Sequence, residues 1–359
     1  MPPQINITLS DRQLRFTLSN VDVSIANAIR RIALSDIITP VFLEENMNFI
    51  TNTSRLHNEI LKQRLACIPI HIDDVEIKLE NYLVEIIKNN EGGSIEYVTT
   101  EDFKIKNIAN DKYLTETQTQ KIFPSNPITK DYILFARLRP QITKDMPGEK
   151  IDIRAKISIS NAKNNGMYNV VSTMTYSNTV NPVTQHQAWQ KYLKQLQKLE
   201  IGPEELGFEK KNWENHQGKR YYTKNSFDFI VETLGNFTNE EIIKKSCEIL
   251  IKKLQLIITN KDQFSNKESE TNLSNSFDII LKNEDYTIGK VIESILYYDY
   301  FLNTQQLAYV GFLKKHPHDN DSIIRIAFVK ETPPDQIFPL IAECCLKGAD
   351  MFKHIMSSF

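Results

Sequence analysis

The chain has 359 residues, of which 41% are hydrophobic and 25% charged, and its 43 basic and 45 acidic residues give a formal net charge of -2. This composition is typical of a globular protein with two or three cores, and it argues against a protein that holds duplex DNA mainly through its own basic surface. The sequence has no basic-then-apolar leader and no apolar run near the ~18 residues of a membrane span, so we expect an intracellular protein outside the membrane.

The four cysteines are expected to be reduced thiols. Cys344 and Cys345 are adjacent, Cys67 and Cys247 fall within apolar periodic segments, and no C-x-x-C pair occurs. Adjacent cysteines rarely bridge each other, and a structural metal site needs spaced ligands. The pattern therefore favours neither a disulfide nor a metal.

The chain begins with a predicted strand, turn and helix. Alternation indicates a strand over 14–18, and Asn20 is typical of a turn. Asp22 or Ser24 can cap the helix that follows, because their side-chain oxygens accept from the free amides of a first turn. Its apolar stripe has helical spacing and comprises Ile25, Ala28, Ile29, Ile32 and Ala33.

The same pattern recurs near the C-terminus. A strand is predicted over 277–281 and a turn at Asn283, and a shift of 263 positions (Leu18 onto Leu281) also aligns Asp22 with Asp285. The apolar stripe of the helix that follows comprises Ile288, Val291, Ile292, Ile295 and Leu296. Strand–turn–helix units resemble one another by chance, so this match alone decides nothing.

A second strand–helix pair also occurs twice, which strengthens the case for a repeat. After a strand over 227–232, Thr238 opens a helix with a capping box to Glu241. After a strand over 323–328, Thr332 is expected to cap a helix with Pro333 at its first position. The first helix carries a stripe of Ile243, Cys247, Leu250, Leu254 and Ile257, and the second one of Ile337, Ile341, Cys344, Gly348, Phe352 and Ile355.

Two copies of one unit with apolar helices predict an α+β fold in which two modules pair about a pseudo-twofold axis. The first module comprises 1–42 plus 184–258, the second comprises 277–359, and the polar segment 259–276 is expected to be a flexible linker. The residues expected at the dimerisation interface are Ile25, Ile29, Ile32, Ile243, Cys247, Leu250, Leu254, Ile288, Ile292, Ile295, Ile337, Ile341 and Phe352.

The segment 43–183 is expected to be a mainly β insertion domain within the first module. Alternating strands separated by turn signals such as Gly92-Gly93 and Asn165-Gly166 support this interpretation. A short helix is expected over 56–65. The expected strands cover 41–49, 72–79, 82–87, 94–98, 151–160 and 170–176. The polar segment 184–221 contains one amphipathic stretch, with Trp189, Leu193, Leu196 and Leu199, that the pattern does not assign to either domain.

These residues resemble the signature of the alpha-type subunits of multisubunit DNA-dependent RNA polymerases. The first segment resembles the bacterial alpha N-terminal domain and the third subunit of eukaryotic RNA polymerase II, through the series Val21-Asp22, Ser24, Ala26-Asn27-Ala28, Arg30-Arg31-Ile32, Asn52-Thr53-Ser54, Leu56, Glu59, Arg64-Leu65 and Ile68-Pro69. The later segment resembles the smaller eleventh subunit, through Glu284-Asp285, Thr287, Gly289, Gly311-Phe312, His316-Pro317 and Thr332-Pro333.

A single chain with both parts resembles the fused subunit of polymerases from large cytoplasmic DNA viruses, with African swine fever virus as the nearest likeness. The resemblance implies a non-catalytic assembly platform that docks the largest, beta-prime-like subunit and the second-largest, beta-like subunit, together with small subunits of the tenth-subunit type. It also implies a location in the host cytoplasm, at viral factories, and in the virion. Cofactors, sequence-specific nucleic-acid binding and membrane contact are not expected. The cysteine cluster that binds zinc in many third subunits is absent here, so no zinc is expected either.

By this resemblance, Asn27, Arg30 and Arg31 are expected to dock a partner. Both arginines fall off the apolar stripe, so their guanidinium groups can meet a partner's carboxylates. The alternative is that they are solvated surface arginines. A second docking strip is expected at Glu59, Arg64 and Leu65, for which local packing of the insertion domain is an equal alternative.

No pattern in the sequence indicates catalysis. His316-Pro317-His318 is a weak ligand set and more typical of a turn, and Asp73-Asp74 lacks the further aspartates of a magnesium site. The 11 glycines form no phosphate-binding loop, and neither a nucleophile elbow nor an H-E-x-x-H motif occurs. The runner-up is an interaction or structural protein with a tandem dimeric fold and no polymerase partners, and an independent hydrolase or nucleotidyltransferase is a distant third.

Overall fold

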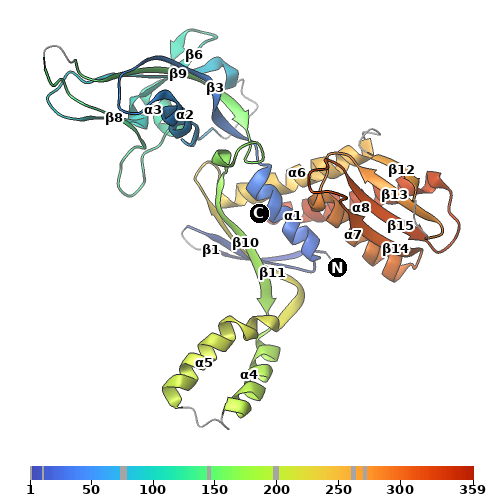
Figure 1. The fold of residues 1–359 in the computed structure, drawn as a ribbon. Helices are drawn as coiled ribbons and strands as arrows, with labels where there is room; N and C mark the ends of the chain where they lie inside the picture. The colour runs from blue at the N-terminus through green and yellow to red at the C-terminus, as the bar shows by residue number, and fades with distance from the viewer. Residues whose placement is uncertain are drawn as a thin grey trace. The chain divides into compact units, whose positions relative to one another are not determined.

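The computed structural model describes residues 2–9, 12–72, 79–143, 147–196, 202–259, 264–269 and 273–359. The chain divides into two compact units. The first comprises Met1–Ala33, Thr173–Glu232 and Asn239–Phe359, and the second comprises Leu34–Ser172 and Thr233–Thr238. Both units mix helices with antiparallel sheets, which confirms the expected α and β content (Figure 1).

The first unit contains two four-stranded sheets whose strands are arranged in the same way. One sheet has the order β1-β2-β11-β10 and the other β12-β13-β15-β14. Each begins with an antiparallel hairpin whose second strand pairs antiparallel with a strand from much later in the chain. The strands are β1 (Gln4–Leu9), β2 (Leu14–Ser19), β10 (Val171–Val180), β11 (Tyr222–Thr233), β12 (Phe264–Glu268), β13 (Ser276–Leu281), β14 (Leu307–Leu313) and β15 (Ser322–Phe328).

Each sheet has two helices. One follows the second strand of the hairpin, and the other follows the strand that pairs with that second strand. We call the first sheet with its helices the N-half and the second sheet with its helices the C-half. The N-half helices are α1 (Val23–Ser35), after β2, and α6 (Asn239–Thr259), after β11. The C-half helices are α7 (Tyr286–Ile295), which continues into the π-helix η7 (Leu296–Asn303), and α8 (Ile337–Met356), after the 3-10 turn η8 (Pro334–Gln336).

The turns into α1 and α7 have the same local structure. Asn20 and Asn283 both adopt positive φ, at 63° and 56°, a conformation that asparagine tolerates better than most residues. Two residues later an aspartate caps each helix: Asp22 accepts from the amide of Ser24 at 2.8 Å, and Asp285 accepts from that of Thr287 at 2.8 Å. The 263-residue shift found in the sequence therefore matches backbone and cap as well as apolar spacing.

The second unit is built around a five-stranded sheet of order β3-β9-β4-β6-β7 and a two-stranded sheet β5-β8. Its strands are β3 (Thr39–Asn52), β4 (Tyr82–Asn89), β5 (Glu96–Thr99), β6 (Phe103–Asn107), β7 (Lys112–Tyr113), β8 (Leu134–Leu138) and β9 (Lys150–Ser160). Its helical segments are α2 (Asn58–Ala66), α3 (Glu116–Ile122), η1 (Leu79–Asn81), η2 (Thr100–Asp102) and η3 (Gly166–Tyr168).

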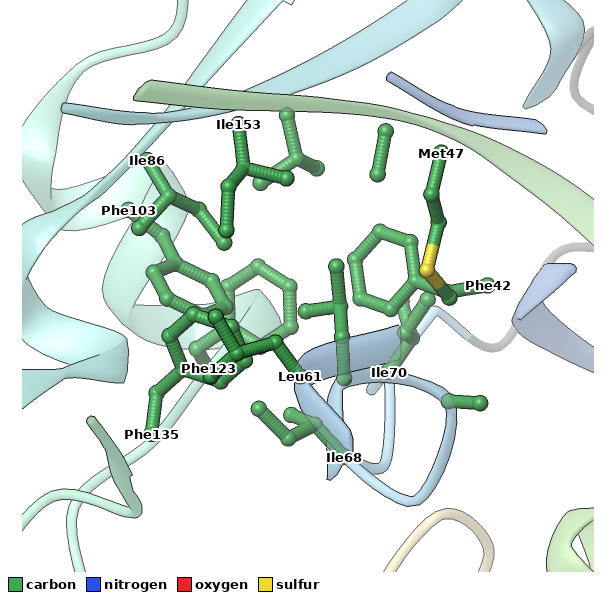
Figure 2. Close-up of a cluster of buried hydrophobic side chains, with 14 of the residues drawn as sticks. Phe42, Met47, Leu61, Ile68, Ile70, Ile86, Phe103, Phe123, Phe135 and Ile153 are labelled. Atoms are coloured by element: carbon green, nitrogen blue, oxygen red, sulfur yellow. The ribbon is translucent and has the colours of Figure 1, made fainter. Parts of the chain in front are cut away.

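One face of this five-stranded sheet carries the core of the second unit. Figure 2 shows Ile86 and Ile153 pointing from the sheet toward a group of aromatic rings and toward Leu61 of α2. Phe103 packs edge-on against both Phe123, with ring centroids 5.3 Å apart, and Phe135, at 6.0 Å. This unit is rich in strands and contains α2 where a short helix over 56–65 was expected, while α3 and strands β6 to β8 were not predicted.

Two boundaries of that domain differ from the prediction of 43–183. The compact unit starts at Leu34 and ends at Ser172, apart from a short return segment. The expected strand over 170–176 is present as β10, but it pairs with β11 in the N-half sheet. Tyr176 of β10 packs against Phe227 and Phe229 of β11, with ring centroids 5.5 and 5.4 Å away. Alternation predicts that a strand exists but not which neighbour it finds.

The segment 184–221 forms a helical hairpin between β10 and β11 (Figure 1). Its helices are α4 (Pro182–Leu196) and α5 (Pro203–Asn215), followed by the 3-10 turn η5 (Gln217–Arg220). The two tryptophans, Trp189 and Trp213, meet with ring centroids 5.4 Å apart, and both are buried. Leu196 joins this small core as the sequence pattern suggests, while Leu199 lies outside the described residues.

Two local predictions in the C-half need correction. The expected linker 259–276 contains β12, which pairs with β13. The described side chains of β12 are exposed, so the sequence lacks the alternation of buried and exposed residues that would indicate a strand. The last helix begins at Ile337, four residues later than expected, because Pro334 holds Pro333 extended, with φ -67° and ψ 146°. Thr332 instead donates its hydroxyl to the carbonyl of Lys330 at 3.0 Å.

The strand β14 was not predicted. Asp73-Asp74 and most of the expected strand 72–79 lie outside the described residues.

Candidate functional site

Helices α1 and α7 join the N-half to the C-half through polar contacts. Arg31 of α1 donates to the carboxylate of Asp285 at 2.5 Å. Ser24, at the other end of α1, donates to the hydroxyl of Ser294 at 2.9 Å. The hydroxyl of Tyr298, just beyond α7, lies 3.3 Å from a carboxylate oxygen of Asp22. The start of each helix therefore meets the end of the other.

Helices α6 and α8 make a second, apolar connection between the halves. Gly348 of α8 lies so close to α6 and α7 that an added Cβ would be 3.1 Å from Leu254 and 3.4 Å from Ile295. Farther along α8, His354 lies 3.1 Å from the carbonyl oxygen of Pro3 in the N-half. From the N-half, Lys253 of α6 donates to Glu284 of the C-half at 3.4 Å.

The C-terminal residue also reaches the N-half sheet. The ring of Phe359 packs edge-on against Phe16 of β2, with centroids 4.9 Å apart, and Phe16 stacks on Phe229 at 4.7 Å. All thirteen residues expected at the dimerisation interface are buried, with at most 5% of their surface exposed. They are Ile25, Ile29, Ile32, Ile243, Cys247, Leu250, Leu254, Ile288, Ile292, Ile295, Ile337, Ile341 and Phe352.

The expected docking residues of α1 lie in different surroundings. Asn27 and Arg30 lie one turn apart, and the guanidinium of Arg30 donates twice to the Asn27 side chain, at 2.9 and 3.1 Å. Both residues are half-buried. Arg31 is bound to Asp285, although each side chain keeps 38% exposure. Arg30 is thus the arginine better placed for an external partner, whereas Arg31 contributes to the joint between the halves.

The second expected docking strip divides in the same way. Glu59 is exposed and its carboxylate lies 2.9 Å from the ring of His57. Arg64 is exposed and donates at 2.8 Å to two carbonyl oxygens of β8, those of Leu134 and Phe135. Leu65 is fully buried in the core of the second unit, where the packing alternative describes it better than docking does.

A shallow cavity of about 520 Å³ lies where α1 meets α7. Its lining includes Asp22, Val23 and Asn27 from α1 and its cap, and Tyr297 and Tyr298 from the helix opposite. Val23, Tyr297 and Tyr298 are exposed by 49%, 40% and 41%. The cavity therefore combines a half-buried carboxylate with apolar and aromatic surface.

The profile of the family described as RNA polymerase Rpb3/Rpb11 dimerisation domain matches residues 15–254. This chain belongs to that family. The match begins in β2 and ends within α6, and it leaves the C-half outside it.

Proteins similar to this Rpb3/Rpb11-family chain are subunits of DNA-directed RNA polymerases. The subunit RPAC1 of RNA polymerases I and III from Saccharomyces cerevisiae is 26% identical over 300 residues, covering 71% of this chain and 86% of the relative. The subunit Rpo3 from Pyrococcus horikoshii is 25% identical over 269 residues, covering 69% of this chain and 93% of the relative. The Rpo3 of Methanosarcina acetivorans is 42% identical over 77 residues, covering 21% and 26% of the two chains.

The described part of this family member holds no group of three or more His, Cys, Asp or Glu side chains placed to bind a metal ion. All four cysteines are unpaired; Cys67 is exposed and the other three are buried. Within the same residues, no helix combines the length and the apolar character that crossing a bilayer requires.

Several residues that join the halves were not singled out by sequence reasoning. Tyr298, Ser294 and Lys253 are polar residues in contact across the two halves. Apolar periodicity cannot find them, because it marks only what is buried in each helix. The 263-residue shift could have suggested one of them, since it aligns Arg31 with Ser294.

Proposed function

We propose that this chain is a non-catalytic assembly-platform subunit of a DNA-directed RNA polymerase in which the two partners of an alpha-like heterodimer are fused. In this proposal the N-half with its insertion domain acts as the larger, third-subunit-type partner. The C-half acts as the smaller, eleventh-subunit-type partner. The observation that carries the proposal is that the chain belongs to a dimerisation family over 15–254 and adds, in its remaining residues, a second sheet of the same strand order.

The contacts between the halves support a pseudo-twofold pairing. In such a pair, if residue i contacts residue j, the equivalent of j contacts the equivalent of i. The shift of 263 positions relates Asp22 to Asp285 and Arg31 to Ser294. Arg31 reaches the cap of α7, and Ser294 reaches Ser24 in the first turn of α1. The ends of α6 and α8 likewise each reach the opposite half, at Glu284 and Pro3.

A platform needs outward surfaces as well as a rigid joint. Arg30 and Asn27 on α1 supply a polar strip next to that joint, and we propose that it docks the second-largest, beta-like subunit. The largest, beta-prime-like subunit is proposed to dock on the C-half, and a small subunit of the tenth-subunit type to join the assembly. We further propose a role in viral transcription, with the protein in the host cytoplasm and the virion, on the strength of the resemblance to fused viral subunits.

The first experiment tests docking. The tagged full chain is expressed with the two largest polymerase subunits of the same source, and co-purification is measured. We expect both large subunits to be recovered, and Arg30→Ala to weaken recovery of the second-largest one, because a partner carboxylate loses a guanidinium. Arg12→Ala removes an exposed arginine elsewhere in the N-half and serves as the matched control. Recovery of neither large subunit with the wild-type chain would contradict the polymerase role and favour the runner-up.

The second experiment tests the fused heterodimer. The chain is cut between Thr259 and Phe264, and the two pieces are produced together in one cell. We expect them to co-purify as one complex, because the apolar helices α6 and α8 bury each other. Leu254→Asp places a charge in that contact and should separate the pieces. Pieces that purify apart without this substitution would show that the halves do not form a pair.

A further inference from the structure

The two aspartate caps of the first unit are equivalent in sequence and local structure but meet different neighbours. At the cap of α7, Asp285 binds the guanidinium of Arg31 at 2.5 Å. At the cap of α1, the residue in the position of Arg31 is Ser294, which is too short to reach the carboxylate and instead meets the hydroxyl of Ser24 at 2.9 Å. The molecule thus shows one cap with an arginine and one with a serine in its place.

The shorter side chain, Ser294, lines the cavity between α1 and α7. It has a volume of about 520 Å³, which is ample for a guanidinium and its aliphatic stem. One Asp22 oxygen faces Tyr298 at 3.3 Å, near the limit of a hydrogen bond, while the other accepts from the Ser24 amide at 2.8 Å. A stronger, charged donor could therefore displace or join the tyrosine hydroxyl without breaking the helix cap.

The charges around the cavity favour a cation. Asp22, Glu293 and Lys290 all line the cavity, and the ammonium of Lys290 is held by Glu293 at 2.6 Å, so the carboxylate of Asp22 is the charge left to attract a cation. A phosphate group would face the carboxylate of Asp22, which disfavours nucleic acid and free anions as occupants. The exposed rings of Tyr297 and Tyr298 add planar aromatic surface, on which guanidinium groups stack more readily than ammonium groups do.

We propose that this cavity receives an arginine side chain from a segment of the second-largest polymerase subunit. The identity of the partner rests on the proposed function, while the arginine chemistry rests on the internal pair Arg31–Asp285. The cavity adjoins Asn27, so the arginine enters beside the polar strip proposed to dock the same subunit. The N-half thus recognises its partner by an arginine–aspartate pair of the same kind as the pair that joins it to the C-half.

Two substitutions separate this proposal from a general weakening of the surface. Asp22→Asn removes the charge but keeps a side chain that caps helices as well as aspartate does. Ser294→Arg supplies an internal guanidinium that reproduces the contact of Arg31 and fills the cavity. Ser294→Gln lengthens the side chain without adding a charge, although it is two bonds shorter than arginine, and it serves as the uncharged control.

The affinity of the full-length chain for the second-largest subunit is measured by biolayer interferometry. We expect roughly ten-fold weaker binding for Asp22→Asn and for Ser294→Arg, since a charged hydrogen bond of this kind is lost in both, and little change for Ser294→Gln. Unchanged affinity in both Asp22→Asn and Ser294→Arg would overturn the proposal while leaving the platform role intact.

Site-specific cross-linking identifies the occupant directly. The photoreactive residue p-benzoylphenylalanine replaces Val23, which lines the cavity and is 49% exposed. After irradiation of the assembled polymerase, we expect the cross-linked peptide to contain an arginine whose replacement by alanine weakens binding no further in the Asp22→Asn background. Cross-links to segments without arginine, or to RNA, would overturn the proposal.

A separate titration keeps the inference testable if the large subunits do not bind at all. N-acetyl-arginine amide is added to the chain with 13C-labelled tyrosine rings, and N-acetyl-lysine amide is added in parallel. We expect shifts of the Tyr297 and Tyr298 signals that are larger with the arginine compound and are lost in Asp22→Asn. Equal shifts with both compounds would overturn the arginine assignment, whereas failure of the large subunits to bind would count against the proposed function alone.

Discussion

The N-half and the C-half share a strand order but present different outer sheet surfaces. In the N-half, Thr17 and Thr179 donate to the carboxylate of Asp228 at 2.7 and 2.8 Å. These hydrogen bonds form a network across strands β2, β11 and β10. In the C-half, Arg325 binds Asp278 through two hydrogen bonds of 2.6 and 2.8 Å. Apolar pairs such as Ile280 and Ile323 lie beside this ion pair.

This difference distinguishes the side chains that folding requires from those that are available to a partner. The inner faces, which hold the helices, are apolar in both halves, as burial of the sheet requires. The outer faces are under no such constraint, so a polar hydroxyl network and an ion pair set in apolar surface can occupy equivalent positions. A pair of related halves can therefore offer two chemically distinct surfaces to two different large neighbours.

The largest expected effect comes from the contact that both halves share. Leu254→Ala should lower the free energy of unfolding by about 2–5 kcal/mol, because it leaves a cavity opposite Gly348 where the helices meet. Leu256→Ala, on the same helix and 47% exposed, should change it by less than about 0.5 kcal/mol. Denaturant unfolding followed by far-UV circular dichroism measures both.

Thiol labelling adds a local readout of the same substitution. Burial raises the pKa of the Cys345 thiol to about 12 and also raises the pKa values of Cys247 and Cys344. These thiols should therefore react with maleimide much more slowly than exposed Cys67. Leu254→Ala should speed their labelling. Equal labelling rates for Cys67 and Cys345 in the wild-type chain would show that the helices do not stay packed.

A smaller effect should distinguish the two capped helices. Gly289 of α7 aligns with Ala26 of α1, yet an added Cβ at Gly289 would overlap the ring of Phe312. Gly289→Ala should cost about 1–3 kcal/mol of unfolding free energy by overpacking, although alanine is the better helix former by about 1 kcal/mol. Thermal unfolding of Gly289→Ala, with and without Phe312→Leu, measures the effect. A stabilised single variant would mean that the ring moves aside freely.

The comparison also shows what the sequence could predict. Burial was predictable because it imposes periodicities that can be counted: all thirteen residues taken from the stripes are buried. Strand partners were harder. The strand β10 was assigned to the wrong domain and β12 was taken for linker, since a strand that exposes its side chains carries little pattern.

Polar positions were the hardest to predict because their roles depend on neighbours distant in the chain. Arg30 and Arg31 are adjacent and identical in type, yet one binds its own helix and the other binds Asp285 of the C-half. Their positions on the helix show that the two side chains point in different directions, but not which residues they contact. Likewise Leu65 lies in the docking motif suggested by resemblance and is buried in a core.

The outer face of the C-half should respond to acid through its ion pair. Hydrogen bonds from Arg325 lower the pKa of Asp278 below its ordinary value of 3.8, so the folded state binds this proton less readily than the unfolded chain does. The stabilisation is complete above that ordinary value and is lost as pH falls through the lowered folded pKa. Asp278→Asn should cost about 1.5–3 kcal/mol at neutral pH and flatten this acid-limb loss. Urea unfolding measured from pH 7 to pH 2.5 tests this, and an unchanged acid slope in the variant would contradict it.

The smallest expected effect compares the two caps directly. Asparagine caps a helix about as well as aspartate, so Asp285→Asn keeps the cap and removes the charge attraction to Arg31, while Asp22→Asn removes a charge that faces Tyr298. The Arg31–Asp285 pair keeps 38% exposure on both side chains, and such pairs contribute about 0–1 kcal/mol. We therefore expect Asp285→Asn to lower the free energy of unfolding by at most that amount, with added salt reducing the difference, and Asp22→Asn to change it less. Chemical unfolding at low and high salt measures both variants. If Asp22→Asn were the more destabilising of the two, the carboxylate at the open cap would already be satisfied within the chain, and an arginine from outside would have little to gain there.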